Sequence, residues 1–291
     1  MSEYYSSFFP GGSANVTLTG PGMAAGLPTR VWHLSDWSAA SANREGAVLA
    51  SGWADFEEPD IVHRWFESAQ VDGATWLGAV GQKTEFSLPV HLNRTPTTAF
   101  ERIRDRFFDD LTPWHTSRLT VNSPRGVRFK DVRLGGKPEV QQTDIAAEVR
   151  QRQSYLVPVV AGQAFWQGLQ VRRVWADGRW DRTAGIANHG DVPAHIDWVL
   201  RGPALFKVPD GDSLVVINVE DGETVRLTTD RSARHVVSDK RPDIHRVMGG
   251  QRLRFPLAPR ESRSVQDIVV VNAGADASAV VSIRPQFRRP F

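Results

Sequence analysis

The apolar residues of this chain fall in short runs interrupted by Gly, Pro, Asp and Asn, and this pattern predicts β-strands over most of its length. Between residues 31 and 92, two such runs are Ala47–Ala50 and Phe86–Val90. Beyond residue 170, the strand-length runs are Leu214–Val219, Thr224–Thr228, Arg252–Leu257, Val265–Asn272 and Ala279–Ile283. Turn pairs such as Asp210–Gly211 and Asp221–Gly222 separate them, a spacing that is typical of a β-sandwich.

One segment has the period of an amphipathic helix instead. Phe100, Ile103, Phe107 and Leu111 recur at helical spacing, which predicts a helix over residues 99–111. Thr98 and Glu101 have the spacing of a capping box. Pro113 is expected to end the helix because proline cannot continue the hydrogen-bond ladder.

The polar face of the expected helix carries several charges, among them Arg102, Arg106, Asp109 and Asp110. Charge runs of this kind usually form a solvated face. The two aspartates lie at the helix end where the helix dipole disfavours negative charge. A second interpretation is therefore that these four residues meet a neighbouring subunit, with the aspartates facing its cations.

Around this helix the sequence predicts further strands. Residues 118–130 indicate a hairpin, with Gly126 where the turn needs a positive φ. Ser154–Val160 is predicted as a strand in which Pro158 must lie at an edge, an end or a bulge. The Gly-rich residues 1–30 hold one strand-like stretch, Asn15–Thr19, and are interpreted as an N-terminal arm.

Composition and the distribution of residue types along the chain change this picture in four ways. The 291 residues carry 35 basic and 33 acidic side chains, and a net charge of +2 argues against sequence-specific nucleic-acid binding. The absence of cysteine excludes disulfides, thiolate zinc sites and cysteine nucleophiles. No signal peptide or membrane-length apolar run is found, so we expect no membrane insertion. Nine of ten tryptophans precede residue 181, which suggests two domains with different cores, over residues 31–170 and 171–291.

The sequence offers few candidate catalytic or metal-ligating residues. His189, Asp191, His195 and Asp197 could in principle ligate a divalent metal, but their spacing matches no known motif and an ordinary polar turn is the favoured interpretation. The acidic stretch Glu57–Asp60 is more simply an exposed loop than a pair of glycosidase carboxylates. Nucleophile-elbow, phosphate-loop and zinc-protease motifs are absent from the sequence. We therefore expect no catalytic residues, no cofactor and no metal.

The tryptophans of the first half offer a binding hypothesis, because exposed indole rings anchor sugars and protein interfaces. Trp32, Trp37, Trp53 and Trp65 stand in loop-like or short-strand contexts, and we expect one or two of them to be exposed.

The order of these features resembles the distal tail protein family of long-tailed siphophages. In the first half the resemblance rests on Phe86–Leu92, Phe100–Phe108, Arg118–Arg128 and Val157–Trp166. In the second half it rests on Ile186–Ala194, Arg201–Leu205, Asp221–Glu223 and Thr228–Arg231. The resemblance implies a mainly β, two-domain fold: a belt-type β domain with one helix, followed by a galectin-like β-sandwich.

The resemblance also implies a function. Its members form a homohexameric ring at the distal end of the tail of a virion made in the host cytoplasm. The ring joins the tail tube protein to the tail-associated or tail-tip protein, and its channel admits the tape measure protein. Such a baseplate or minor tail protein is a scaffold and not an enzyme. The Gly-rich start would be an arm that lies on a neighbouring subunit or on the tube.

Two alternative functions belong to other classes of protein. A lectin-like adhesin module would bind host cell-wall polysaccharide, although the sequence lacks the sugar motif of galectins. A β-sandwich glycan hydrolase would use carboxylates such as Glu57 or Glu58. A ring of six subunits distinguishes the tail protein from both.

Overall fold

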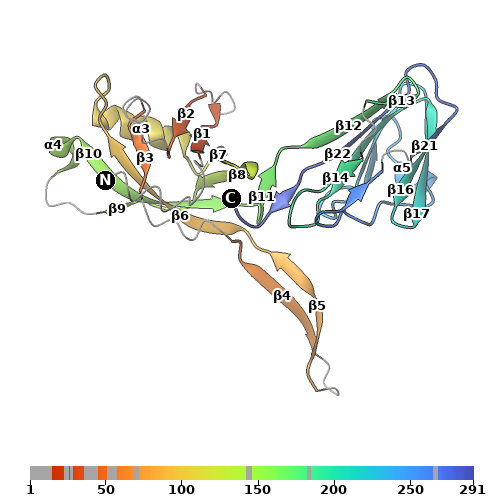
Figure 1. The fold of residues 1–291 in the computed structure, drawn as a ribbon, viewed down its shortest axis with the longest axis horizontal. Helices are drawn as coiled ribbons and strands as arrows, with labels where there is room; N and C mark the ends of the chain where they lie inside the picture. The colour runs from red at the N-terminus through yellow and green to blue at the C-terminus, as the bar shows by residue number, and fades with distance from the viewer. Residues whose placement is uncertain are drawn as a thin grey trace. The chain divides into compact units, whose positions relative to one another are not determined.

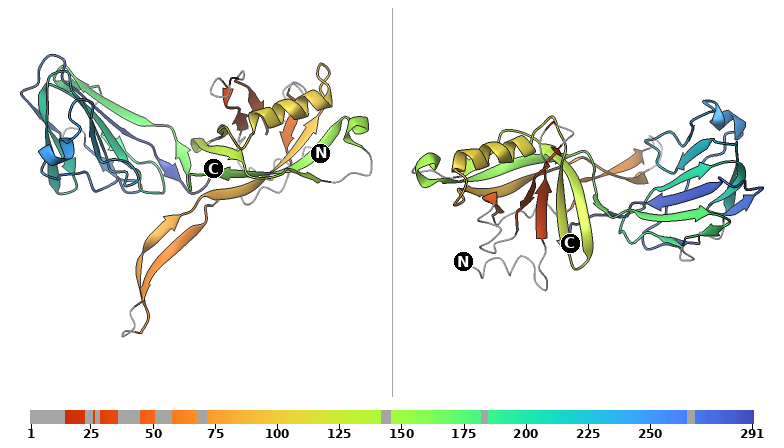
Figure 2. Two further views of the ribbon diagram at one scale, coloured as in Figure 1. Left: turned by 180° about the vertical axis from the view of Figure 1, so that it is seen from behind. Right: turned by 90° about the horizontal axis from the view of Figure 1, so that it is seen from above.

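A computed structural model describes residues 15–22, 26, 29–35, 45–50, 58–67, 72–141, 146–181, 185–264 and 268–291. The fold is mainly β and has two compact units, drawn in Figures 1 and 2. Unit 1 comprises the chain up to Gln167 together with Arg288–Phe291, and unit 2 is Gly168–Phe287. The predicted domain boundary follows residue 170, and the last four residues are predicted to lie in the second domain. They belong to unit 1.

Unit 1 is built on one antiparallel sheet with the strand order β2-β1-β7-β8-β10-β6-β3. Its strands are β1 (Asn15–Thr19), β2 (Val31–His33), β3 (Ala47–Leu49), β6 (Thr84–Asn93), β7 (Ser117–Ser123), β8 (Gly126–Leu134) and β10 (Arg152–Ala161). The short β9 (Glu139–Gln141) pairs with β10, and β11 (Trp166–Gly168) pairs with β8. Strands β4 (Ile61–Glu67) and β5 (Ala74–Gly81) pair only with each other.

The helix α3 (Phe100–Asp110) lies along unit 1's sheet in Figures 1 and 2, and a four-residue helix, α4 (Ala147–Arg150), precedes β10. The structure confirms the predicted helix to within one residue at each end. Phe100, Ile103 and Phe107 are buried, as the helical period requires. The predicted capping box is wrong, because Ala99 is the N-cap and makes no side-chain cap bond. The N–H of Thr98 is instead bonded to Thr95 Oγ1, 3.0 Å away.

Of two further predictions for unit 1, the first needs correction and the second agrees with the structure. Asn15–Thr19 is a strand as expected, but it lies between β2 and β7 of its own sheet and buries Val16 and Leu18 completely. This stretch is therefore not an arm, and residues 1–14 lie outside the described residues. Pro158 lies within β10, not at its end. On the side of β10 away from β6, neither β8 nor β9 has a ladder partner for Val157 or Pro158, and the Pro158 carbonyl accepts the N–H of Gly135, at 2.8 Å. The proline therefore occupies a local edge, one of the predicted alternatives.

Unit 2 is a β-sandwich. One sheet has the order β13-β12-β22-β15-β18-β19 and the other β17-β16-β21, with a small pair β14-β20. The strands are β12 (Val171–Ala176), β13 (Arg179–Trp180), β14 (Ile186–Ala187), β15 (Ile196–Arg201), β16 (Ala204–Asp210), β17 (Ser213–Val219), β18 (Thr224–Thr228), β19 (Val236–Ser238), β20 (Ser262–Arg263), β21 (Val269–Val271), β22 (Ser278–Ile283) and β23 (Gln286–Phe287). A short helix, α5 (Ile244–Val247), follows β19.

Alternate residues of the facing strands form the core of unit 2, for example Leu200 on β15, Phe206 on β16 and Val281 on β22. Period-two alternation in the sequence predicts this packing. The strand predicted at Arg252–Leu257 is wrong, since only an isolated bridge joins Leu257 to Ala194. The buried carboxylate of Asp210 accepts the N–H groups of Arg254 and Phe255 at 2.9–3.0 Å, so these groups are not free for a strand ladder.

Candidate functional site

The hairpin β4–β5 is exposed over nearly its whole length. Every residue of β4 is exposed, and β5 is exposed at all but two positions. Its exposed large apolar side chains are Ile61, Val62, Trp65, Phe66, Trp76, Leu77 and Val80, which are 39–64% accessible. An isolated two-stranded hairpin is marginal in water, and exposed apolar patches mark interaction surfaces.

Both faces of this hairpin are apolar. Trp65 lies opposite Trp76, and Val62 opposite Val80, so each pair shares one face. Phe66 follows Trp65 directly and therefore points to the other face. His63 accepts a hydrogen bond at Nδ1 from Trp76 Nε1, at 3.1 Å, which fixes that indole ring. The hairpin thus offers apolar contacts on two sides.

Among the four tryptophans selected from the sequence, the structure distinguishes two. Trp65 is 55% exposed, as expected of an anchor. Trp32 is buried and packs edge-to-face on Phe107 with ring centroids 5.4 Å apart. Trp37 and Trp53 lie outside the described residues.

Three of the four helix residues proposed for an interface are exposed, namely Arg102, Arg106 and Asp109. Asp110 is not available, because its side chain is completely buried. Its Oδ2 accepts a hydrogen bond from Trp32 Nε1 at 2.9 Å and pairs with Arg30 Nη1 at 3.2 Å. The cation that Asp110 meets therefore comes from its own chain, which corrects that part of the hypothesis.

Neither partner of Asp110 is predicted from the sequence. Arg30 and Trp32 flank the start of β2, about 80 residues away along the chain. A Cβ atom added at Gly20 would lie 2.5 Å from Asp110 Oδ1, so the close approach of β1's end to the carboxylate requires glycine there. Asp110 Oδ1 has no hydrogen-bond partner among the described residues.

A second buried charge in unit 1 is Lys130 of β8. Its side chain is 1% exposed, and its ammonium donates to Thr84 Oγ1 at 3.0 Å and to the carbonyl of Ala164 at 2.9 Å. The ammonium also lies 5.3 Å from the centre of the Trp166 ring. Burial without a carboxylate partner lowers the pKa of Lys130 from 10.5 to about 8.

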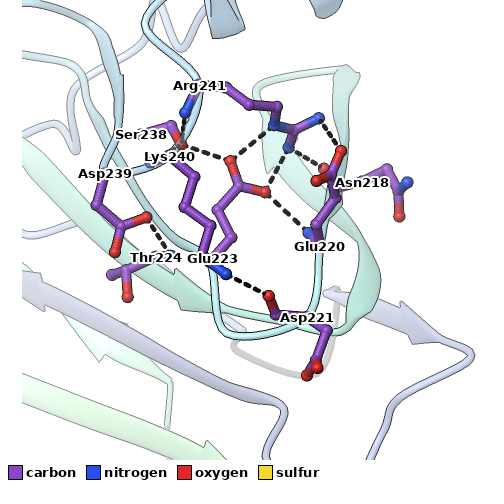
Figure 3. A network of polar contacts seen from close by, with 9 residues as sticks. All are labelled: Asn218, Glu220, Asp221, Glu223, Thr224, Ser238, Asp239, Lys240 and Arg241. Carbon is purple, nitrogen blue, oxygen red and sulfur yellow. Dashed lines mark hydrogen bonds and ion pairs between the residues drawn. The ribbon is translucent and has the colours of Figure 1, made fainter.

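In unit 2, Glu223 is the centre of a polar network, drawn in Figure 3. Its buried carboxylate accepts hydrogen bonds from Arg241 Nε at 2.7 Å and Nη2 at 2.6 Å, from the hydroxyl of Ser238, and from the N–H of Glu220 at 2.8 Å. Burial raises the pKa of Glu223, but the bonds from Arg241 and Ser238 outweigh it and hold the pKa below its usual value. The network joins the β17–β18 turn to the segment after β19, a structural role.

Unit 2 also has two neighbouring cavities. One, of about 400 Å³, is lined by Thr229, Arg231, His235, Arg252, Leu253 and Arg254. The other, of about 470 Å³, has a mixed lining that includes Arg226, Arg234, Asp197 and Asp230. The first is therefore basic, whereas the charges of the second balance.

The other sequence candidates do not form a site. Across the described ranges, no group of three or more His, Asp or Glu side chains is arranged to hold a metal, the stretch from His189 to Asp197 included. Asp197 accepts a hydrogen bond from the hydroxyl of Thr228 at 2.6 Å. Glu58 pairs with Arg289 at 2.7 Å, and Glu57 lies outside the described residues. Nor does the described part of the chain contain a helix long and apolar enough to cross a membrane.

Comparison with known proteins gives a result at the level of structure alone. No protein-family model matches the sequence, and no curated protein matches it significantly. A solved structure, "Crystal Structure of SPP1 Dit (gp 19.1) Protein, a Paradigm of Hub Adsorption Apparatus in Gram-positive Infecting Phages", is similar with a TM-score of 0.55 at 12% identity, over 94% of this chain and 99% of that one. Chains of the phage P2 baseplate in its activated conformation match with a TM-score of 0.47 at 10% identity, over 94% and 98%. Across both units, the chain therefore has the fold of a phage hub protein.

Proposed function

We propose that this protein is a structural component of the tail tip of a long-tailed phage. In this proposal six copies form a ring at the distal end of the tail, joining the tail tube to the tail-tip proteins and leaving a channel for the tape measure protein. The observation that carries the proposal is the similarity to the SPP1 hub protein, which covers almost the whole of both chains. No catalytic role is assigned to any residue.

The β4–β5 hairpin supports assembly in particular. A closed ring needs two different, complementary patches on each subunit. The hairpin has apolar side chains on both faces and contributes few charges, so its burial against another copy would remove much apolar surface from water. We assign the hairpin as one of the two patches. The exposed Arg102, Arg106 and Asp109 of α3 are proposed for the other.

Mass photometry and negative-stain images of the purified full-length chain test the ring directly. We expect a hexameric annulus. A wild-type protein that stays monomeric at micromolar concentration would overturn the proposal, and retention of such a monomer on host cell walls would favour the adhesin instead.

Variants test the two patches separately. Changing Trp65 and Phe66 together to Ser should abolish the annulus while leaving each subunit folded, because both side chains are already exposed in the single chain. Trp114→Ser is the matched control, since Trp114 is 82% exposed but lies outside the hairpin. Arg106→Glu should weaken assembly, also without unfolding. Normal assembly of the Trp65/Phe66 variant would contradict the role of the hairpin.

A further inference from the structure

The first of the two cavities in unit 2, which we call the basic cavity, has no role in the proposed ring. Three arginines, Arg231, Arg252 and Arg254, line its volume of about 400 Å³, and no carboxylate lines it. Within the described ranges, none of the three guanidinium groups has a hydrogen-bond or ion-pair partner in the chain. Other arginines of unit 2, such as Arg241 and Arg263, are paired with glutamates. The cavity therefore concentrates positive charge that the chain leaves unneutralised.

The backbone that presents these arginines is held firmly. Leu253 is 2% exposed and lies in the core, whereas Arg252 and Arg254 on either side of it are exposed. The carboxylate of Asp210, itself 2% exposed, holds the N–H groups of Arg254 and Phe255. The arginines thus project from a segment that Leu253 and Asp210 hold at its buried side.

The opposite wall is fixed in the same way. Thr229 is 2% exposed, and its hydroxyl accepts the N–H of Ile196 at 2.9 Å. The nearby Asp230 is turned into its own loop, where Oδ1 accepts the N–H and the hydroxyl of Ser232 at 2.8 and 2.7 Å. Arg231 and His235 follow on this loop between β18 and β19. Asp230 therefore makes its hydrogen bonds within its own loop and is not among the residues that line the cavity.

We propose that this cavity binds a phosphate group carried on a small polyol or sugar unit. Guanidinium groups recognise the oxygens of phosphate in pairs, and three of them here face one space. A volume of about 400 Å³ is within the range of small-molecule sites and larger than a bare ion needs, which leaves room for the carrier. The neighbouring cavity, with its two arginines balanced by Asp197 and Asp230, does not have this chemistry. The inference concerns unit 2 alone and does not rest on the ring.

Phosphorus NMR line broadening of glycerol 3-phosphate by the full-length protein tests the site, at constant ionic strength set with sodium chloride. We expect broadening that saturates. The double variant Arg252→Gln/Arg254→Gln should weaken binding at least about tenfold, equivalent to about 1.4 kcal/mol. Arg179→Gln is the matched control, because Arg179 is an exposed arginine on β13, at the far edge of the sheet from β19. It should leave binding within about twofold of wild type.

A second arm uses inorganic phosphate. Tighter binding of glycerol 3-phosphate than of inorganic phosphate supports a site for a phosphate ester, whereas equal or tighter binding of the inorganic ion assigns the site to free phosphate. The proposal is overturned if neither probe broadens at about 10 mM, a concentration that would detect a 1 mM site. It is also overturned if the double variant and Arg179→Gln bind alike. Circular dichroism spectra that match wild type would verify that the variants are folded.

Discussion

Units 1 and 2 each bury a carboxylate, but they satisfy it to different degrees. In unit 2, both oxygens of Glu223 accept hydrogen bonds, and all the donors lie within residues 220–241. In unit 1, Asp110 uses one oxygen for Trp32 and Arg30, and the other has no partner among the described residues. Unit 1 also buries Lys130 without a carboxylate. The Glu223 network of unit 2 is thus complete and local, whereas the charges of Asp110 and Lys130 in unit 1 are incompletely compensated, which costs stability.

The largest expected effect comes from breaking the complete network. Arg241→Ala should destabilise unit 2 by about 3–5 kcal/mol, because it leaves Glu223 charged, buried and without its main partner. Denaturant unfolding of the full chain, followed through the transition of unit 2, measures this change.

Two controls sharpen this first test. Replacing both partners, as Glu223→Leu with Arg241→Met, should cost less than Arg241→Ala alone, since no unpaired charge remains. Lys83→Ala removes an exposed ion pair with Glu85 and should change stability by less than about 1 kcal/mol. A cost of Arg241→Ala no greater than that of Lys83→Ala would contradict the structural role of the network.

The next largest effect is expected on the pH dependence of stability, through Lys130. Its pKa is about 8 in the folded chain and 10.5 in an unfolded one, so between these values the unfolded state binds more protons and stability rises with pH. Below pH 8 Lys130 is charged in both states, and burial of its ammonium group lowers the free energy of unfolding by about 3 kcal/mol. Lys130→Met should therefore stabilise unit 1 at pH 7 and remove part of the rise in stability between pH 8 and 10.5.

Unfolding midpoints of wild type and Lys130→Met, measured at several pH values, give the difference directly. Other groups titrate in both proteins and cancel in the comparison. Parallel pH profiles for the two proteins would show that Lys130 does not titrate in this range.

The smallest effect is expected at Asp110. Trp32→Phe keeps an aromatic ring packed edge-to-face against Phe107 but removes the indole N–H, leaving Asp110 with Arg30 alone. Loss of a donor to a buried charge should destabilise unit 1 by about 1–3 kcal/mol. Leu34→Ala, at a fully buried apolar position in the same region, measures the cost of a cavity for comparison. No loss of stability in Trp32→Phe would mean that Arg30 alone satisfies the carboxylate.

The sequence predicts those parts of the structure that depend on local periodicity. The spacing of Phe100, Ile103 and Phe107 locates α3, and alternation locates strands such as β17 and β18. It does not predict features decided by distant partners. The burial of Asp110 depends on Trp32, and Arg252–Leu257 is not a strand because Asp210 binds its backbone.

The candidate sites follow the same rule. The exposure of Trp65 agrees with its context in the sequence, but the double-sided apolar hairpin emerges only from the pairing of β4 with β5. The basic cavity unites arginines from two loops about 20 residues apart, which no spacing motif would reveal.

The return of Arg288–Phe291 to unit 1 makes unit 2 an insertion with two covalent junctions. These junctions are neighbours, because the N–H of Gly168 is bonded to the carbonyl of Pro285 at 2.8 Å. When unit 2 unfolds while unit 1 stays intact, its chain becomes a closed loop of about 120 residues with less conformational freedom than a free tail of that length.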